Sequence, residues 1–576
     1  MTRLAPSRGI AVLLSARRTT LRLAPIGVVL AAALLRFMDL GRAQLYQDEA
    51  ASWQLAGYPI GELLEHNVGK AYPPLYGVLL HAWMLLFGTG AAALRNPSAI
   101  AGVVTVVVAW RWAHEGLGRT AGLMTATVVA VSALLIANSR EARMYSIETA
   151  FATIAWWLTW KLVADSRSLG QKPGRRTYLI AGALSLAVAG EVWTLAFGLA
   201  DAGLQFLFVL ASLALSSTSG DDRRLSDPGP WLAIGSIFVG AASFSVWLPT
   251  LLAVPLGGES FWTPRPDLGS LRDTFFYFLG VSGRVDLSAP APIAAAVLVA
   301  AGIVGLAMPA RRRPASGPAE ADETADDADD KRRIQLLGLA AALGTSMVAV
   351  VWIYSQIDPV YASRYMGAAA VPLAILIAAG VVALARYTGG RALSAVLAVA
   401  VLVPMTGGAM LTVGNLDKDV DAAPGLQTAQ ELISLVRPGD TVLALDAQTY
   451  LPINYNLDHD ADGAGVDDIL YDWDAAGEPF YIGTSLVATD RVVSPATVAR
   501  VGWLNAMPGL RFGGTVWLVT VTAGDSTHLG FVPLDSGVFV EQTAASVFVH
   551  PDGSATGQIR ALKLRPFGPT APIAVP

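Results

Sequence analysis

The sequence has no cysteine, which excludes disulfide bonds, a thiol nucleophile and thiolate-bound metals. Its six histidines never fall at the His-x-x-His or His-Glu-x-x-His spacings of zinc enzymes, so a zinc centre is disfavoured. No Walker or dinucleotide-binding glycine motif stands between a strand and a helix, and nucleotide hydrolysis is therefore not indicated. With a net charge of −5, we expect no nucleic-acid partner.

Charged residues are also scarce. They make up 15% of the 576 residues, whereas soluble domains carry about 25%. Hydrophobic residues reach 53%, and the mean hydropathy is +0.50. This composition is typical of a membrane protein.

Apolar stretches near the length of a membrane span recur along the first 413 residues. A spanning helix needs about 20 apolar residues, with a tolerance down to about 17, and we predict a polytopic α-helical protein with about 11 spans. The candidates are Leu23–Leu40, Ser98–Ala113, Ala121–Ala137, Ser146–Val163, Tyr178–Val192, Thr194–Leu215, Trp231–Ala253, Ile293–Pro309, Ile334–Ser355, Tyr365–Ala385 and Ala392–Val413.

Basic residues orient these spans. The stretch Leu75–Phe87 is short and stands between Pro73-Pro74 and Gly88, so we interpret it as a helix in the outer interface. Leaving it out of the count places nearly every basic cluster in the cytoplasm, as the positive-inside rule requires. These clusters are the N-terminus, Arg111–Arg119, Lys161–Arg176, Arg223-Arg224, Arg311–Arg333 and Arg386–Arg391. Asp48, Arg140–Tyr145, Phe261–Arg265 and Arg364-Tyr365 then face outward.

We predict three regions. Residues 1–22 form a cytoplasmic N-terminus, and residues 23–413 form the transmembrane domain, with a first outer loop at 41–97 and a disordered cytoplasmic loop at 310–333. After Val413 the composition is that of a soluble protein, and residues 414–576 suffice for one extracytoplasmic α/β domain. There we expect strands at Thr441–Leu445, Thr515–Val521 and Val538–Val540, and helices at Thr428–Val436 and Ser494–Leu504.

Two adjacent carboxylates, Asp48 and Glu49, follow the first span. Acids kept at a membrane surface suggest a catalytic site. The alternative is that they cap and stabilise the first turn of an interfacial helix. The two interpretations are compatible, because a capped helix is also a rigid mount for a base.

Basic residues are sparse on the predicted outer side, and the exceptions are informative. Arginine side chains match phosphate oxygens well, so the basic residues on this side together favour a phosphate site at the membrane surface. For any one of them, an interfacial anchor that binds lipid headgroups is the alternative. The set consists of Lys70, Arg95, Arg140, Arg143, Arg265 and Arg364.

A weak calcium candidate lies in the C-terminal region, where Asp458, Asp460 and Asp462 alternate before Gly463. The twelfth loop position holds Ile469 instead of glutamate, which favours an ordinary acidic loop. The sequence requires no cofactor, and a divalent cation is compatible with it.

Several short motifs follow one another in a specific order. They are Asp48-Glu49, Pro73-Pro74-Leu75-Tyr76, Leu94-Arg95-Asn96-Pro97-Ser98, Arg140-Glu141-Ala142-Arg143-Met144-Tyr145, Phe261-Trp262-Thr263-Pro264 and Ser363-Arg364-Tyr365. Over roughly residues 23–385 the sequence resembles the GT-C glycosyltransferases of the protein O-mannosyltransferase and lipid A aminoarabinose transferase type. It departs from them at Tyr72, where His or Lys is common, and near Glu191-Val192-Trp193, which replaces a His-Tyr pair.

The resemblance implies inverting transfer of a sugar from a polyprenyl-phosphate donor, with Asp48 as the base and Glu49 beside it. Arg143, Arg364 and Arg95 are the candidates for the donor phosphate, together with Lys70, and Tyr145 and Tyr365 are candidates for added hydrogen bonds. We expect Trp53, Tyr72, Glu141 and Trp262 to line the substrate site.

We therefore expect a glycosyltransferase of the bacterial cytoplasmic membrane, with its active site and C-terminal domain on the extracytoplasmic face. Mannose or arabinofuranose is the expected sugar, and a glycan, lipid or protein hydroxyl is the expected acceptor. Two alternatives stay open: a transporter or flippase for an envelope lipid, and a non-enzymatic envelope-assembly protein.

Overall fold

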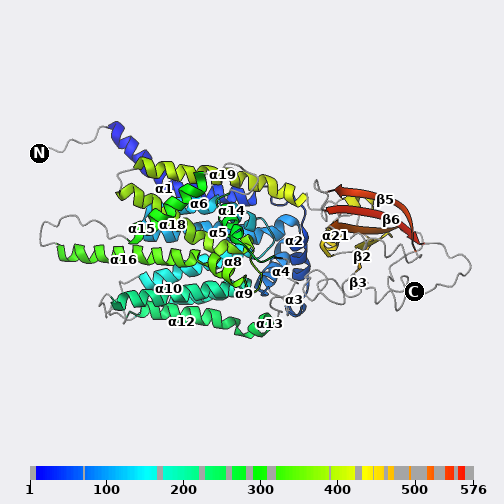
Figure 1. Cartoon of the computed structure of the whole chain (residues 1–576), viewed down its shortest axis with the longest axis horizontal. Helices are drawn as coiled ribbons and strands as arrows, with labels where there is room; N and C mark the ends of the chain where they lie inside the picture. Colours follow the sequence, from blue (N-terminus) through cyan, green and yellow to red (C-terminus); the bar gives the residue numbers. More distant parts are fainter. Residues whose placement is uncertain are drawn as a thin grey trace, which may run out of the picture. The chain divides into compact units, whose positions relative to one another are not determined.

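A computed structural model gives the fold of the chain (Figure 1). It describes residues 8–68, 72–164, 173–218, 227–253, 263–280, 290–307, 320–387, 391–421, 431–444, 447–459, 465–471, 492–493, 515–523, 539–549 and 555–564. The chain divides into two compact units, which we describe separately. Unit 1 comprises Met1–Leu40, Gly69–Tyr76 and Arg95–Gly414, and unit 2 comprises Gly41–Val68, Gly77–Leu94 and Asn415–Pro576.

Unit 1 is a helical bundle. Figure 1 shows four of its long helices, α10, α12, α16 and α19, running in nearly the same direction. The helices are α1 (Arg8–Phe37), α5 (Ala91–Leu117), α6 (Arg119–Ala130), α7 (Ala133–Ser139), α8 (Tyr145–Ala164), α9 (Arg175–Thr194), α10 (Gly198–Thr218), α12 (Pro228–Ala242), α13 (Leu248–Leu252), α14 (Leu268–Phe278), α15 (Pro290–Ala307), α16 (Glu320–Thr345), α17 (Met347–Tyr354), α18 (Gly367–Tyr387) and α19 (Arg391–Asp421). Short 3-10 helices η2 (Ser243–Val246) and η3 (Ser363–Met366) precede α13 and α18.

The chain is a polytopic membrane protein. Among the described residues, seven helices are long and apolar enough to cross a membrane, and up to eight if the bent pair α6–α7 forms one span. These seven coincide with seven of the predicted stretches. Of the others, Leu23–Phe37 and Ala291–Leu306 form shorter apolar helices, and α8 carries Glu148 and Lys161, which lower its hydropathy. The larger predicted number of spans therefore stays a prediction.

The predicted disordered loop differs from the structure in its second half. Helix α16 begins at Glu320, so residues 320–333 are helical, while residues 310–319 lie outside the described part. Aspartate is the commonest residue of this stretch and is a poor helix former, but alanine, glutamate, lysine and arginine, which favour helix, together outnumber it.

A buried arginine occupies the break between α6 and α7, whose axes differ by 59°. The guanidinium of Arg36 on α1 is fully buried and donates to the carbonyl oxygens of Val129 at 3.3 Å and Ala130 at 3.1 Å. It also donates to the hydroxyl of Ser139 at 3.3 Å. The last carbonyls of a helix have no partner within it, so Arg36 caps α6 inside the bundle.

Replacing Arg36 with methionine should destabilise the bundle. Each carbonyl that loses its partner costs about 1–3 kcal/mol when buried, so thermal unfolding in detergent should begin at a lower temperature. The exposed Arg42 gives a matched control, because Arg42→Met breaks no buried contact of this kind. Gly102→Ala should act like Arg36→Met, since a Cβ there would collide with Ser139 Oγ and Arg36 Nε. Unchanged melting of both variants would contradict the capping role.

Unit 2 combines the first loop with the C-terminal region. The loop contributes α2 (Gln47–Gly57), α3 (Ile60–Asn67) and α4 (Leu75–Phe87), the last with the bounds of the predicted interfacial helix. The C-terminal region has strands β1 (Thr441–Ala444), β2 (Asp467–Tyr471), β3 (Val492–Val493), β4 (Val516–Ala523), β5 (Phe539–Val549) and β6 (Ala555–Leu564), and helix α21 (Ala447–His459). The predicted helix at Ser494–Leu504 lies outside the described residues.

The C-terminal strands form one mixed sheet in the order β3-β2-β1-β4-β6-β5. The first four are parallel, while β6 is antiparallel to both β4 and β5. A turn at Pro438–Asp440 precedes β1, and Gly439 there has φ of +93°, which glycine adopts without strain. The Asp440 carboxylate accepts from the Thr515 amide at 2.8 Å and the Trp517 indole at 2.9 Å, which ties β1 to β4.

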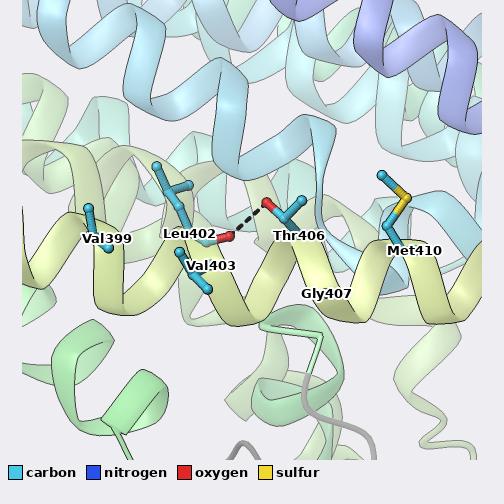
Figure 2. A pocket seen from close by; sticks show the side chains of 6 residues that line it. All are labelled: Val399, Leu402, Val403, Thr406, Gly407 and Met410. Carbon is cyan, nitrogen blue, oxygen red and sulfur yellow. Dashed lines mark hydrogen bonds between the residues drawn. The ribbon is translucent and has the colours of Figure 1, made fainter.

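A shallow groove of about 360 Å³ runs along one face of α19 (Figure 2). Val399, Leu402, Val403, Thr406, Gly407 and Met410 line it. The Thr406 hydroxyl donates to the Leu402 carbonyl at 2.7 Å, which satisfies the polar side chain of this lining within the helix. An apolar helix face of this kind suits contact with lipid chains.

Candidate active site

The two adjacent carboxylates stand in the first turn of α2. The Tyr46 carbonyl accepts from the amides of Glu49 at 3.0 Å and Ala50 at 2.9 Å, so the helix begins directly before the acids. Negative charge in a first turn is stabilised by the helix dipole. Asp48 is half-buried, whereas Glu49 is only 1% exposed. Asp48 is therefore the more accessible of the two carboxylates.

Within unit 1, Arg143 and Arg364 meet at one tyrosine. The guanidinium of Arg143 lies 5.8 Å from the centre of the Tyr145 ring, and that of Arg364 lies 5.5 Å from the same ring. Arg143 also lies 5.3 Å from the Tyr72 ring, and Arg364 lies 5.7 Å from the Tyr365 ring. Cations over aromatic faces are held in place by cation–π attraction, so this cluster holds both guanidinium groups at the same tyrosine.

The backbone behind the two arginines is held by buried polar side chains. Ser98 donates its hydroxyl to the Arg143 carbonyl at 2.9 Å, and Asn138 donates its amide to the Arg364 carbonyl at 2.9 Å. Gly367 follows η3, and a Cβ there would collide with the Thr149 hydroxyl. The close approach of α18 to α8 therefore requires glycine at this position.

Tyr72 brings a hydroxyl to the same cluster, 3.3 Å from the hydroxyl of Tyr365. Burial raises the pKa of the Tyr72 phenol well above its ordinary value; Tyr365 and Tyr145 raise it further, and Arg143 opposes them. The phenol therefore stays protonated at neutral pH and keeps a hydrogen to donate to an anion.

Arg95 and Arg140 have structural contacts. Arg95 is 4% exposed and donates to the Leu40 carbonyl at 2.9 Å. Arg140 donates to the carbonyls of Met38 at 2.6 Å and Leu35 at 3.4 Å. Both arginines bind carbonyl oxygens at or just after the end of α1, a role that the sequence did not reveal for Arg95.

The remaining predicted site residues are scattered. Glu141 is half-buried between α7 and α8, and Trp53 packs within unit 2 against Tyr455. Lys70, Trp262, Asp460 and Asp462 lie outside the described residues, and Asp458 is exposed. In the part of the chain that the structure describes, no three His, Asp or Glu side chains gather as metal ligands. The calcium candidate stays a prediction.

The bundle holds a buried polar cluster that the sequence did not reveal, formed by Glu191, Asp201, Gln205 and Trp156. The Gln205 amide donates to Glu191 at 3.1 Å and to Asp201 at 3.1 Å, and the Trp156 indole donates to Asp201 at 3.0 Å. The signal for this cluster in the sequence was the presence of two acidic residues, Glu191 and Asp201, inside apolar stretches.

Residues 71–247 match the family described as dolichyl-phosphate-mannose-protein mannosyltransferase. This segment includes Tyr72 and Arg143 and leaves out Asp48 and Arg364. Comparison with curated protein sequences gives no match.

Several solved structures are similar to this chain. ArnT from Cupriavidus metallidurans in the apo state has a TM-score of 0.55 at 14% identity, covering 93% of this chain and 97% of that one. Its complex with undecaprenyl phosphate has a TM-score of 0.50 with the same identity and coverage. Archaeal oligosaccharyltransferase AglB from Archaeoglobus fulgidus, in complex with an inhibitory peptide and a dolichol-phosphate, reaches 0.47 at 11% identity, with 94% and 74% covered.

The helical bundle, the family match and the ArnT-like fold agree with the resemblance seen in the sequence motifs. The chain is a multi-pass membrane protein with an ArnT-like fold, and its residues 71–247 match the dolichyl-phosphate-mannose-protein mannosyltransferase family.

Proposed function

We propose that this protein is an inverting glycosyltransferase that moves a sugar from a polyprenyl-phosphate donor to an acceptor hydroxyl. The observation that carries the proposal is the pair of guanidinium groups, those of Arg143 and Arg364, held over the Tyr145 ring. Two guanidinium groups held at one tyrosine can both donate hydrogen bonds to the same anion. A phosphate suits the planar fork of arginine.

The donor phosphate is also the leaving group. As the bond between the sugar C1 and the phosphate oxygen breaks, the bonding electrons move to the phosphate, and its negative charge grows. Arg143 and Arg364 would stabilise that charge, and the protonated Tyr72 phenol would add a neutral hydrogen-bond donor. This arrangement favours the transition state over the bound donor.

Asp48 is the proposed base. An acceptor hydroxyl is a weak nucleophile at neutral pH, so a carboxylate that takes its proton as the new bond to C1 forms speeds the reaction by about 10²–10⁴-fold. The half-buried Asp48 suits this role better than Glu49, which is buried. Attack opposite to the leaving phosphate inverts the configuration at C1.

Mannose is the sugar we favour, and arabinofuranose is second. The matching family is described by its mannose donor, while undecaprenyl phosphate is the lipid bound in one ArnT structure. The acceptor is a hydroxyl of a glycan, lipid or protein. By the distribution of basic residues, we place the reaction on the outer face of a bacterial cytoplasmic membrane.

The test is a donor panel. The full chain, purified in nanodiscs, would be incubated with radiolabelled polyprenyl-phosphomannose, polyprenyl-phosphoarabinofuranose and, as a control, free nucleotide sugars. We expect transfer from a lipid-linked donor and none from nucleotide sugars, with an inverted anomeric configuration by NMR. Transfer that persists in EDTA would show that no divalent cation is needed. Transport of lipid without transfer of any sugar would refute the proposal in favour of a flippase.

A further inference from the structure

Helix α2, which carries Asp48, packs against helix α21 of the C-terminal region within unit 2. The contact is aromatic. The Trp53 ring meets the Tyr455 ring edge-on, with centres 5.2 Å apart and planes at 85°, and meets the His459 ring at 5.8 Å. Tyr455 and His459 stand one turn apart on α21 and stack on each other at 4.1 Å, so they form one surface for Trp53.

This aromatic surface is itself fixed to the turn after α4. The Tyr455 hydroxyl donates to the Thr89 carbonyl at 3.2 Å, and His459 Nε2 lies 2.8 Å from the Thr89 hydroxyl. His459 Nδ1 lies 2.8 Å from the Tyr455 carbonyl, which can only accept, so Nδ1 carries the hydrogen. In the neutral ring Nε2 then accepts from Thr89. Three residues thus close a network around the Trp53 contact.

A second contact holds the far end of α2. His81 on α4 binds the Ala56 carbonyl through Nδ1 at 2.7 Å, at the last turn of α2. Trp53 follows Asp48 by five residues, which places it about 140° around the helix and about 7.5 Å along it. Asp48 is therefore on a different face from Trp53. If α2 rotates about its own axis, Asp48 moves through the same angle as Trp53.

We propose that helix α21 positions Asp48, with Tyr455 and His459 as positioning residues that hold Trp53 and thereby set the rotation of α2. The inference rests on the proposed function, in which Asp48 is the base. It assigns the C-terminal region a task in the reaction, which is to hold the base.

The kinetic test compares Tyr455→Leu with Tyr455→Phe in the full chain. Misplacing a catalytic group by about 1 Å can cost about 10²-fold in rate, so we expect Tyr455→Leu to lower kcat by about 10- to 100-fold. The KM for the lipid-linked donor should stay within about twofold, because the donor is bound by other residues. Tyr455→Phe keeps the ring that Trp53 meets, and His459 still contacts Thr89, so this variant should retain most of the wild-type kcat. A fall in kcat that is equal for both variants would overturn the proposal.

A second measurement does not depend on activity. Because the chain has no cysteine, Asp48→Cys introduces a single thiol whose maleimide labelling rate reports its surroundings. We expect Tyr455→Leu to change this rate several-fold and Tyr455→Phe to leave it unchanged, with melting temperatures showing that all variants are folded. An unchanged labelling rate in Tyr455→Leu would overturn the positioning role.

The kinetic and labelling measurements together distinguish failure of this inference from failure of the proposed function. If the wild-type chain transfers no sugar from any donor, the proposed function fails, and the labelling rate alone decides whether α21 sets the position of α2. If transfer occurs, an unchanged kcat in Tyr455→Leu overturns the further inference and leaves the proposed function standing.

Discussion

Asp48→Asn should lower sugar transfer by about 10²–10⁴-fold, because the amide keeps the shape of the carboxylate and cannot take a proton from the acceptor hydroxyl. The loss should appear in kcat, with the donor KM nearly unchanged. Asp48 also lies in the first turn of α2, where losing its charge costs only about 0.3–1 kcal/mol, so the protein should remain folded. Initial rates with the lipid-linked donor and thermal melting of the same preparation measure both effects.

Glu62→Gln is the matched control for Asp48→Asn. Glu62 is also a first-turn acid of a helix in unit 2, it is exposed, and it has no part in the proposed chemistry. Its replacement should leave the rate unchanged. If Asp48→Asn transferred sugar as fast as the wild type, Asp48 would be only a helix-stabilising residue, and another group would have to act as the base.

Arg143→Gln and Arg364→Gln should each lower the rate by about 10²–10³-fold, the usual effect of removing one donor from a developing oxyanion. Each variant also loses a positive charge that would bind the phosphate, so part of the loss should appear as weaker binding of polyprenyl phosphate. Arg143→Lys should recover only part of the rate, because lysine keeps the charge and lacks the planar fork. Rates and inhibition by free undecaprenyl phosphate give the two quantities.

Arg272→Gln serves as the control for the two arginine variants. Arg272 is exposed on α14, pairs with its neighbour Asp273 at 2.9 Å and lies over the Phe276 ring. We expect no change in rate or in inhibition by the lipid phosphate. Full activity of both Arg143→Gln and Arg364→Gln would show that these two arginines do not stabilise the leaving phosphate.

The arginines illustrate the limits of sequence reasoning. Arg95, Arg140, Arg143 and Arg364 share a residue type and a predicted outer location, and the sequence grouped them as one phosphate-binding set. The structure divides them: Arg95 and Arg140 bind carbonyls at the end of α1, whereas Arg143 and Arg364 gather around tyrosines. The partners lie far away in sequence, so local patterns could not distinguish the two uses.

Individual helices and strands were easier to predict from the sequence. The apolar run Leu75–Phe87 became α4 with the same bounds, and the buried pattern after Asp440 became β1, Thr441–Ala444. The role of Arg36 could not be predicted, because no pattern near it in the sequence indicates that the carbonyl end of α6 lies against its guanidinium. The aromatic contact between Trp53 and Tyr455 joins residues about 400 positions apart and was equally out of reach.

The sequence by itself determined that this is a helical membrane protein with a strand-containing C-terminal region, because hydrophobicity and periodicity are properties of neighbouring residues. Only the tertiary structure decided which arginines face tyrosines, which cap helices, and which helix holds Asp48 in place. Those outcomes depend on contacts between distant segments, whose geometry is set by packing of the whole bundle and sheet.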